Sequence, residues 1–131
     1  MSSPKHYSCC RVKISDSALV KSLAVSLKDY NNGAMFRGAF GRIDKTAASD
    51  DYYVQIFDSE TLPADGTSTA GNLLVSSQQI THVNGTDSRF SIDALDDFIK
   101  AKNGIVVLVS TTEFTVTLIG SDSMSATIFY K

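Results

Sequence analysis

The sequence predicts an all-β fold: a single β-sandwich of jelly-roll type, with eight or nine short strands and one short helix. Serine and threonine account for 18 and 11 of the 131 residues, proline occurs twice and tryptophan is missing, a composition that favours strands and turns. Pairs suited to tight turns recur at short intervals: Asn32-Gly33, Asp65-Gly66, Asn84-Gly85 and Asn103-Gly104. The length suits one domain, and an apolar fraction of 43% supports a core without disulfide or metal.

The chain is predicted to begin with an N-terminal arm, residues 1–13, followed by the sandwich domain, residues 14–131. The arm carries three basic residues and no acid, so it contributes +3, and a chain of net charge −2 leaves −5 for the remainder. Opposite charges on a partner attract within about 8–10 Å at physiological salt. The residues expected to bind a partner are therefore Lys5, His6, Tyr7, Arg11 and Lys13.

The next segment, residues 18–30, has a pattern that fits two structures. Leu19, Leu23 and Leu27 recur at nearly helical spacing, while Leu23, Val25 and Leu27 also alternate with small residues. We favour a strand, because a turn pair follows and another apolar segment then returns. That returning segment, Phe36 to Ile43, is predicted to be a strand loosened by its glycines.

The middle of the chain contains one clear strand, two weaker ones and the helix. Residues 52–57 are rich in aromatic and β-branched side chains, whereas residues 73–80 and 88–92 are weaker strand candidates. Residues 93–102 are predicted to form the helix. Asp93 would cap its first turn, lysines would lie near its C-terminus, and Asn103-Gly104 would end it.

The last third of the chain contains the most regular strand patterns. Residues 105–109 are apolar on both faces, which indicates a central strand. Residues 114–118 alternate apolar side chains with threonine, and residues 124–130 alternate in the same way and would close the sheet. The residues predicted to lie in the core between the two sheets are Val54, Ile56, Ile105, Val107, Phe114, Val116 and Ile128.

No arrangement of residues points to catalysis, a metal or another cofactor. The two histidines, His6 and His82, have no motif around them, and a structural role is expected for both. Cys9 and Cys10 are adjacent, which suits neither a structural disulfide nor, with His6, the CxxC spacing of a zinc half-site. The paired carboxylates Asp50-Asp51 and Asp96-Asp97 lack the spacing of a calcium loop and are interpreted as solvated residues. We therefore expect a protein that is not an enzyme.

Charge and hydropathy argue against some classes of partner and some cellular locations. A net charge of −2 is unlike the basic footprint of a general nucleic-acid binder, so no nucleic-acid partner is expected. The first thirteen residues hold no apolar run of the secretory kind, and no window approaches 18 consecutive apolar residues. We expect neither secretion nor a membrane partner.

Two segments resemble a known group of proteins. YYVQIFDSETLPADG (Tyr52 to Gly66) and NGIVVLVSTTEFTVTLIG (Asn103 to Gly120) resemble paired segments of small virion-associated β-sandwich proteins from tailed bacteriophages. In those proteins a strand ends in a "QLFD"-like turn before an "LPADG"-like loop, and a later strand carries a "GIVVALSST"-like run. The closing strand fits too, so the resemblance covers roughly residues 37–131, and the first 35 residues have no counterpart.

The resemblance implies a non-enzymatic structural protein of a phage particle. The expected role is a capsid decoration, or cement, protein that bridges major capsid subunits and forms a homo-oligomer on the particle. Such a protein would be made in the bacterial host cytoplasm and lie on the capsid surface of the virion. The sequence leaves one alternative open, a carbohydrate- or receptor-binding module of a head fibre, tail or baseplate, in which Tyr30, Tyr52 and Tyr53 stack on sugar rings.

Overall fold

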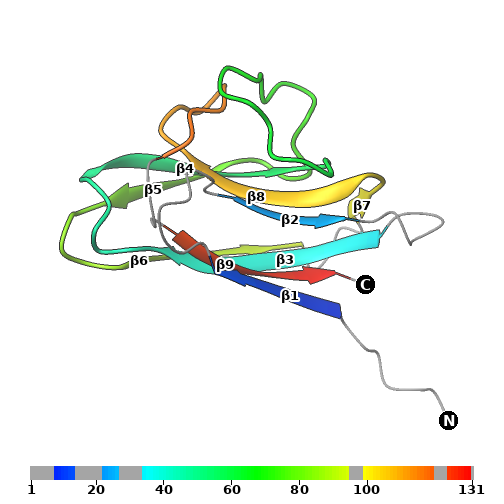
Figure 1. The fold of residues 1–131 in the computed structure, drawn as a ribbon, viewed down its shortest axis with the longest axis horizontal. Helices are drawn as coiled ribbons and strands as arrows, with labels where there is room; N and C mark the ends of the chain where they lie inside the picture. Colours follow the sequence, from blue (N-terminus) through cyan, green and yellow to red (C-terminus); the bar gives the residue numbers. More distant parts are fainter. Residues whose placement is uncertain (1–7, 14–21, 27–33, 95–98, 120–123, 131) are drawn as a thin grey trace, which may run out of the picture.

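A computed structural model of the chain describes residues 8–13, 22–26, 34–94, 99–119 and 124–130. Of residues 8–13, 22–26 and 34 it describes the backbone alone. Nine strands and no helix occur in these ranges, and the strands form two stacked layers (Figure 1). The strands are β1 (Ser8–Lys13), β2 (Ser22–Ser26), β3 (Ala34–Ile43), β4 (Asp50–Phe57), β5 (Gln78–His82), β6 (Ser88–Asp93), β7 (Ile99–Ala101), β8 (Gly104–Ser110) and β9 (Met124–Tyr130).

The strand order is that of a jelly roll. One layer, here called the β9 sheet, has the order β1-β9-β3-β6, and β7 also pairs with β3; the other, the β8 sheet, has the order β2-β8-β4-β5. The pairs β1/β9, β2/β8, β3/β6 and β4/β5 are nested and antiparallel, so the chain forms a long two-stranded ribbon that folds over itself. The predicted fold class, an all-β sandwich of jelly-roll type, is confirmed.

The core lies between the two sheets, and β8 contributes most regularly to it. Every residue of β8 is buried. Ile105, Val107 and Val109 face the main core, together with Val54 and Ile56 of β4 and Ile128 of β9. The predicted apolar character of both faces of this strand therefore corresponds to a central position in its sheet.

A second, smaller apolar cluster covers the outer side of the β8 sheet. It contains Phe57, Val106, Leu108 and Val116, with Leu62, Leu73 and Leu118 packed against it. The loops over residues 58–77 and 111–119 close it from above (Figure 1). The backbones of these two loops bind each other, since the N–H of Gly66 donates to the Val116 carbonyl and the N–H of Val116 to the Thr67 carbonyl, both at 2.8 Å. Strand β8 is thus buried on both faces.

The strand predicted over residues 114–118 is wrong. This segment is a loop with two isolated bridges, Ser68 to Thr115 and Ser110 to Leu118. Phe114, predicted to lie in the core, is 73% exposed. Val116 is buried, but in the cluster outside the β8 sheet and not between the sheets. The alternating pattern fits this loop as well as a strand, because Val116 packs on the β8 sheet while its neighbours point away from it.

The predicted helix over residues 93–102 is also wrong at both ends. Asp93 is the last residue of β6, and Ile99–Ala101 form β7; residues 95–98 lie outside the described part. Pairing with β3, which sets Ala34 opposite Ala101 and Phe36 opposite Ile99, satisfies the backbone in place of helical bonds. Strand pairing with β3 has therefore outweighed the local helix signals, which were the capping residue and the spacing of the apolar residues.

The remaining sequence-based boundaries shift by a few residues. The strand expected over 73–80 begins only at Gln78, although Leu73 makes an isolated bridge with Phe57. Within 18–30, Ser22–Ser26 form a strand, as favoured, and the flanking residues lie outside the described part. Of the arm predicted over 1–13, Ser8–Lys13 form β1 and pair with β9 along their whole length, and residues 1–7 lie outside the described part. Within the described residues, no helix is long and apolar enough to cross a membrane.

Candidate partner-binding face

The outward side of the β9 sheet differs from that of the β8 sheet, because no described loop covers it. Side chains alternate along its strands, with Phe36, Phe90 and Ile128 turned into the core. The side chains of the opposite parity lie on the outward side, and we call this set the outer face. It comprises Phe40 and Arg42 of β3, Arg89, Ser91 and Asp93 of β6, and Ser125, Thr127 and Phe129 of β9.

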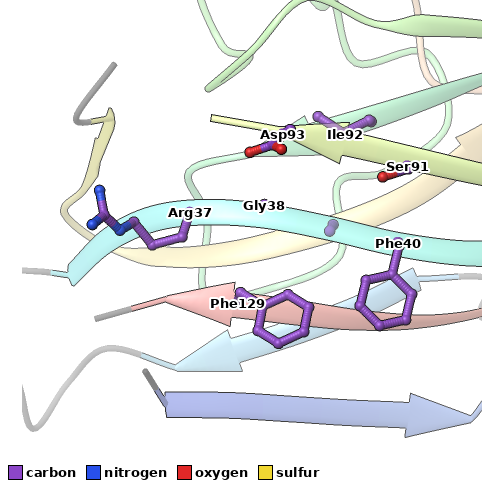
Figure 2. Close-up of a pocket in the computed structure, with 8 residues that line it drawn as sticks. Arg37, Gly38, Phe40, Ser91, Ile92, Asp93 and Phe129 are labelled. Atoms are coloured by element: carbon purple, nitrogen blue, oxygen red, sulfur yellow. The ribbon is translucent and has the colours of Figure 1, made fainter. Parts of the chain in front are cut away.

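An aromatic pair forms the centre of the outer face. The rings of Phe40 and Phe129 lie 5.2 Å apart between centroids and are tilted by 32°, a favourable arrangement for aromatic side chains. Phe40 is nevertheless 48% exposed. Figure 2 shows both rings on the same side of the sheet, with Ser91 and Asp93 on the neighbouring strand. An aromatic side chain left half in water on an open sheet face is typical of a contact surface.

A groove of about 320 Å³ lies beside Phe40. Its walls are mostly apolar, formed by Phe40, Phe129 and Ile92, with Arg37 and Asp93 at one end. Gly38 leaves room for this groove and for a close approach of two strands, since a Cβ at that position would lie 2.8 Å from the carbonyl oxygen of Ile92. The pairing register between β3 and β9 also shifts between Phe36 and Gly38, which bends the strand there.

Charged groups line both ends of the outer face. Arg42 lies directly opposite Arg89 in the pairing of β3 with β6. Its guanidinium is neutralised within the chain by Asp87, with Nη1 3.2 Å from Oδ2, and by Asp44, with Nη2 3.7 Å from Oδ2. The side chain of Arg89 makes no hydrogen bond or ion pair with the other residues that the structure describes. One cation of this cross-strand pair is therefore compensated and the other is open to a partner.

The turn after β3 holds Asp44, one of the two acidic residues that compensate Arg42. Asp44 accepts hydrogen bonds from the backbone N–H and the hydroxyl of Thr46, both at 3.0 Å. These bonds lower the pKa of Asp44 below its ordinary value of 3.8; burial opposes them, and the charges of Arg42 and Lys45 act in the same direction as the bonds. The carboxylate of Asp44 is therefore charged at neutral pH.

The partner-binding residues predicted from the sequence lie beside this face or outside the described part. Lys5, His6 and Tyr7 are not described. Arg11 and Lys13 belong to β1, where the pairing sets their backbones opposite Thr127 and Ser125 of β9. The aromatic pair was not predicted from the sequence. The available signal was the alternation over residues 124–130, in which Phe129 falls on the face opposite Ile128.

The residues considered for chemistry have structural surroundings. His82 is buried, with Nδ1 2.7 Å from the hydroxyl of Ser88. Asp51 accepts a hydrogen bond from its own strand partner Thr81 at 2.9 Å. Tyr52 is buried and donates its hydroxyl hydrogen to the Ala48 carbonyl at 2.6 Å, so its ring is not available to stack on a sugar. Within the described ranges, no group of three or more His, Cys, Asp and Glu side chains could hold a metal ion.

Comparison with known proteins yields a distant structural likeness alone. No family model and no curated protein sequence matches this chain. Two solved structures of the Tobacco streak virus coat protein, one of them a dimer, are similar at 12% sequence identity and a TM-score of 0.43. The likeness covers 100% of this chain and 90% and 88% of those chains. At this level it assigns no role to this chain.

Proposed function

We propose that this chain is a non-enzymatic structural protein of a virus particle, and specifically a decoration protein that bridges major capsid subunits of a tailed bacteriophage. The observation that carries the proposal is the asymmetry of the two sheets. The centre of the β8 sheet is covered on its outer side by the chain's own loops, whereas the β9 sheet presents an aromatic pair and an uncompensated arginine. Such a domain is rigid at the β8 sheet and can bind a partner through the β9 sheet.

The rigidity comes from buried polar side chains that bind backbone groups. Gln55 donates to the carbonyls of Thr112, Glu113 and Thr115, at 2.9, 3.2 and 3.2 Å. Ser110 donates to the Thr112 carbonyl at 2.8 Å and accepts from the N–H of Thr117 at 2.9 Å. Such bonds order loops without preparing a reactive group, which supports a structural role.

The assignment to tailed phages is supported by the segments that carry the resemblance. Residues 52–66 and 103–120 are distant in sequence, yet β4 and β8 pair within them. Their loops are joined as well, since the N–H of Leu118 donates to Asp65 at 2.8 Å. The resemblance therefore falls on one packed unit of the molecule and not on two unrelated strands.

Binding to particles tests this proposal. The purified chain is mixed with capsids of the phage that encodes it, prepared without the chain, and sedimented through a gradient. We expect the chain to migrate with the capsids at a fixed copy number and to raise the temperature at which they rupture. A chain that remains at the top of the gradient at every concentration would overturn the proposal.

One observation favours the alternative, a carbohydrate-binding module. Phe114 is 73% exposed at the tip of the 111–119 loop, close in sequence to the hydroxyl cluster of Thr112, Thr115 and Thr117. The phenylalanine ring can stack on a sugar, and the threonine hydroxyls can bind the polar edge of that sugar. A glycan array with the parent chain and Phe114→Ala would test it, since the alternative predicts binding that the substitution abolishes.

A further inference from the structure

We propose that the outer face of the β9 sheet binds a second copy of this chain, with a two-fold axis close to Phe40. This inference concerns contacts between copies and does not depend on the proposed role on a capsid. It rests on the arrangement of one exposed aromatic side chain, Phe40, and two opposite charges on the same face. Each of these has its complement at the position that a two-fold rotation would bring to it.

The centre of the face is a row of three residues in register. Thr127 of β9 lies opposite Phe40 of β3, and Phe40 lies opposite Ser91 of β6. On β6, Arg89 lies two residues to one side of this row and Asp93 two residues to the other. Residues two apart share a face, and at about 3.3 Å per residue the two charged positions are about 13 Å apart.

A two-fold axis through this row pairs the charges. Rotation about it brings Arg89 of each copy to Asp93 of the other, so that two ion pairs form. Like Arg89, Asp93 makes no side-chain hydrogen bond or ion pair with the other described residues. Arg42 does not disturb the match, because Asp87 and Asp44 already compensate it within its own chain. A face whose free charges complement themselves is suited to an isologous contact.

The same rotation brings the two Phe40 side chains together, because Phe40 lies in the row through which the axis passes. Phe40 projects from the face, with Phe129 beside it (Figure 2). Each Phe40 ring would contact the Phe40 ring of the other copy at the centre of the interface. The contact then has an apolar centre and a charged rim, which is the usual composition of a specific protein interface.

The size of the face sets the strength of the contact. Three strands about 4.8 Å apart and about seven residues long present roughly 300 Å² on each copy. Stable complexes bury about 800 Å² on each partner, and smaller contacts are weak and reversible. We therefore expect a dimer that dissociates on dilution, with a Kd in the micromolar range or weaker.

Sedimentation of the full chain between about 1 μM and 1 mM tests the proposal. We expect a monomer–dimer equilibrium, and we expect Phe40→Ser to weaken it at least about tenfold. Phe114→Ser is the matched control, because it removes a more exposed phenylalanine from a loop on the other sheet and should leave the equilibrium unchanged. A chain that stays monomeric throughout, or an equal effect of the two substitutions, would overturn the proposal.

Charge reversal provides a test in which dimerisation is first weakened and then recovered. Arg89→Asp and Asp93→Arg should each weaken dimerisation about tenfold, since each sets like charges against each other. The double variant Arg89→Asp/Asp93→Arg should recover to within about threefold of the parent, because the ion pairs re-form with their polarity exchanged. A double variant no tighter than the single ones would exclude this interface. Capsid binding by a strictly monomeric variant would leave the proposed function standing.

Discussion

The side-chain amide of Gln55 donates a hydrogen bond to the carbonyl oxygen of Thr112, 57 residues further along the chain, at a distance of 2.9 Å. Gln55 is fully buried in β4, and its amide nitrogen also lies within 3.2 Å of the carbonyls of Glu113 and Thr115. One side chain therefore determines the path of the 111–119 loop and, through it, the cover of the outer cluster.

Replacing Gln55 with leucine should destabilise the protein by about 1–3 kcal/mol. Leucine is of similar size, but it cannot donate to the carbonyls of Thr112, Glu113 and Thr115, so the hydrogen bonds of this buried side chain are lost. The free energy of unfolding in urea measures this. Gln79→Leu, at an exposed position of β5, is the matched control and should change stability by less than about 0.5 kcal/mol. Equal effects at the two positions would contradict the role of Gln55.

Phe114 and Val116 should respond to truncation in the reverse of the order that side-chain size suggests. Phe114→Ala should cost less than about 0.5 kcal/mol because the ring lies mostly in solvent. Val116→Ala should cost about 1–3 kcal/mol, since it removes methyl groups from the closed cluster beside Phe57 and Leu108. Thermal melting of both variants distinguishes this arrangement from a strand in which Phe114 is the core residue. In that case Phe114→Ala would cost about 3–5 kcal/mol.

Removing the carboxylate of Asp58 should loosen the turn between β7 and β8. Its two oxygens accept hydrogen bonds from the backbone N–H groups of Lys102, Asn103 and Gly104, at 2.7 to 3.2 Å. Hydrogen bonds to a charged group contribute about 1.5–3 kcal/mol, so Asp58→Ala should lower stability by roughly that amount. Glu60→Ala, two residues away and exposed, should have little effect. Faster amide exchange at 102–104 in the first variant alone would identify the turn as the affected region.

Stability should fall at alkaline pH through Tyr52. Burial raises the pKa of Tyr52 above its ordinary value of 10.0, and the charge of Asp50 adds to the effect. The folded protein therefore holds this proton more tightly than the unfolded chain, so the contribution is complete below pH 10 and is lost as the pH rises beyond it.

Tyr52→Phe isolates this contribution, because it cannot ionise at that position. It should cost about 1 kcal/mol at neutral pH, through loss of the bond to the Ala48 carbonyl, and its stability should fall less steeply than that of the parent above pH 10. Urea unfolding at pH 7 to 11 measures both effects. Parallel curves for parent and variant would exclude Tyr52 as the group responsible.

The sequence by itself determined the class of fold and the centre of the core. Residues 105–109 form a central strand, as their apolar character on both faces requires, and Val54, Ile56, Ile105, Val107 and Ile128 are buried. Turn pairs and alternating strands limit a chain of this length to a small set of sandwiches. The apolar pattern alone predicts burial, because the hydrophobic effect favours removing an apolar side chain from water whichever residue packs against it.

Only the tertiary structure decided which surfaces the strands and loops face. The alternation over 114–118 is compatible with a strand, but Gln55 binds the carbonyls that a neighbouring strand would otherwise have to bind. Residues 99–101 pair with β3, and the free energy of this pairing outweighs the local preference for a helix. The exposure of Phe40 has the same origin, since it depends on which sheet the loops cover. A periodic pattern states that one side of a segment is buried, and the partner that buries it comes from elsewhere in the chain.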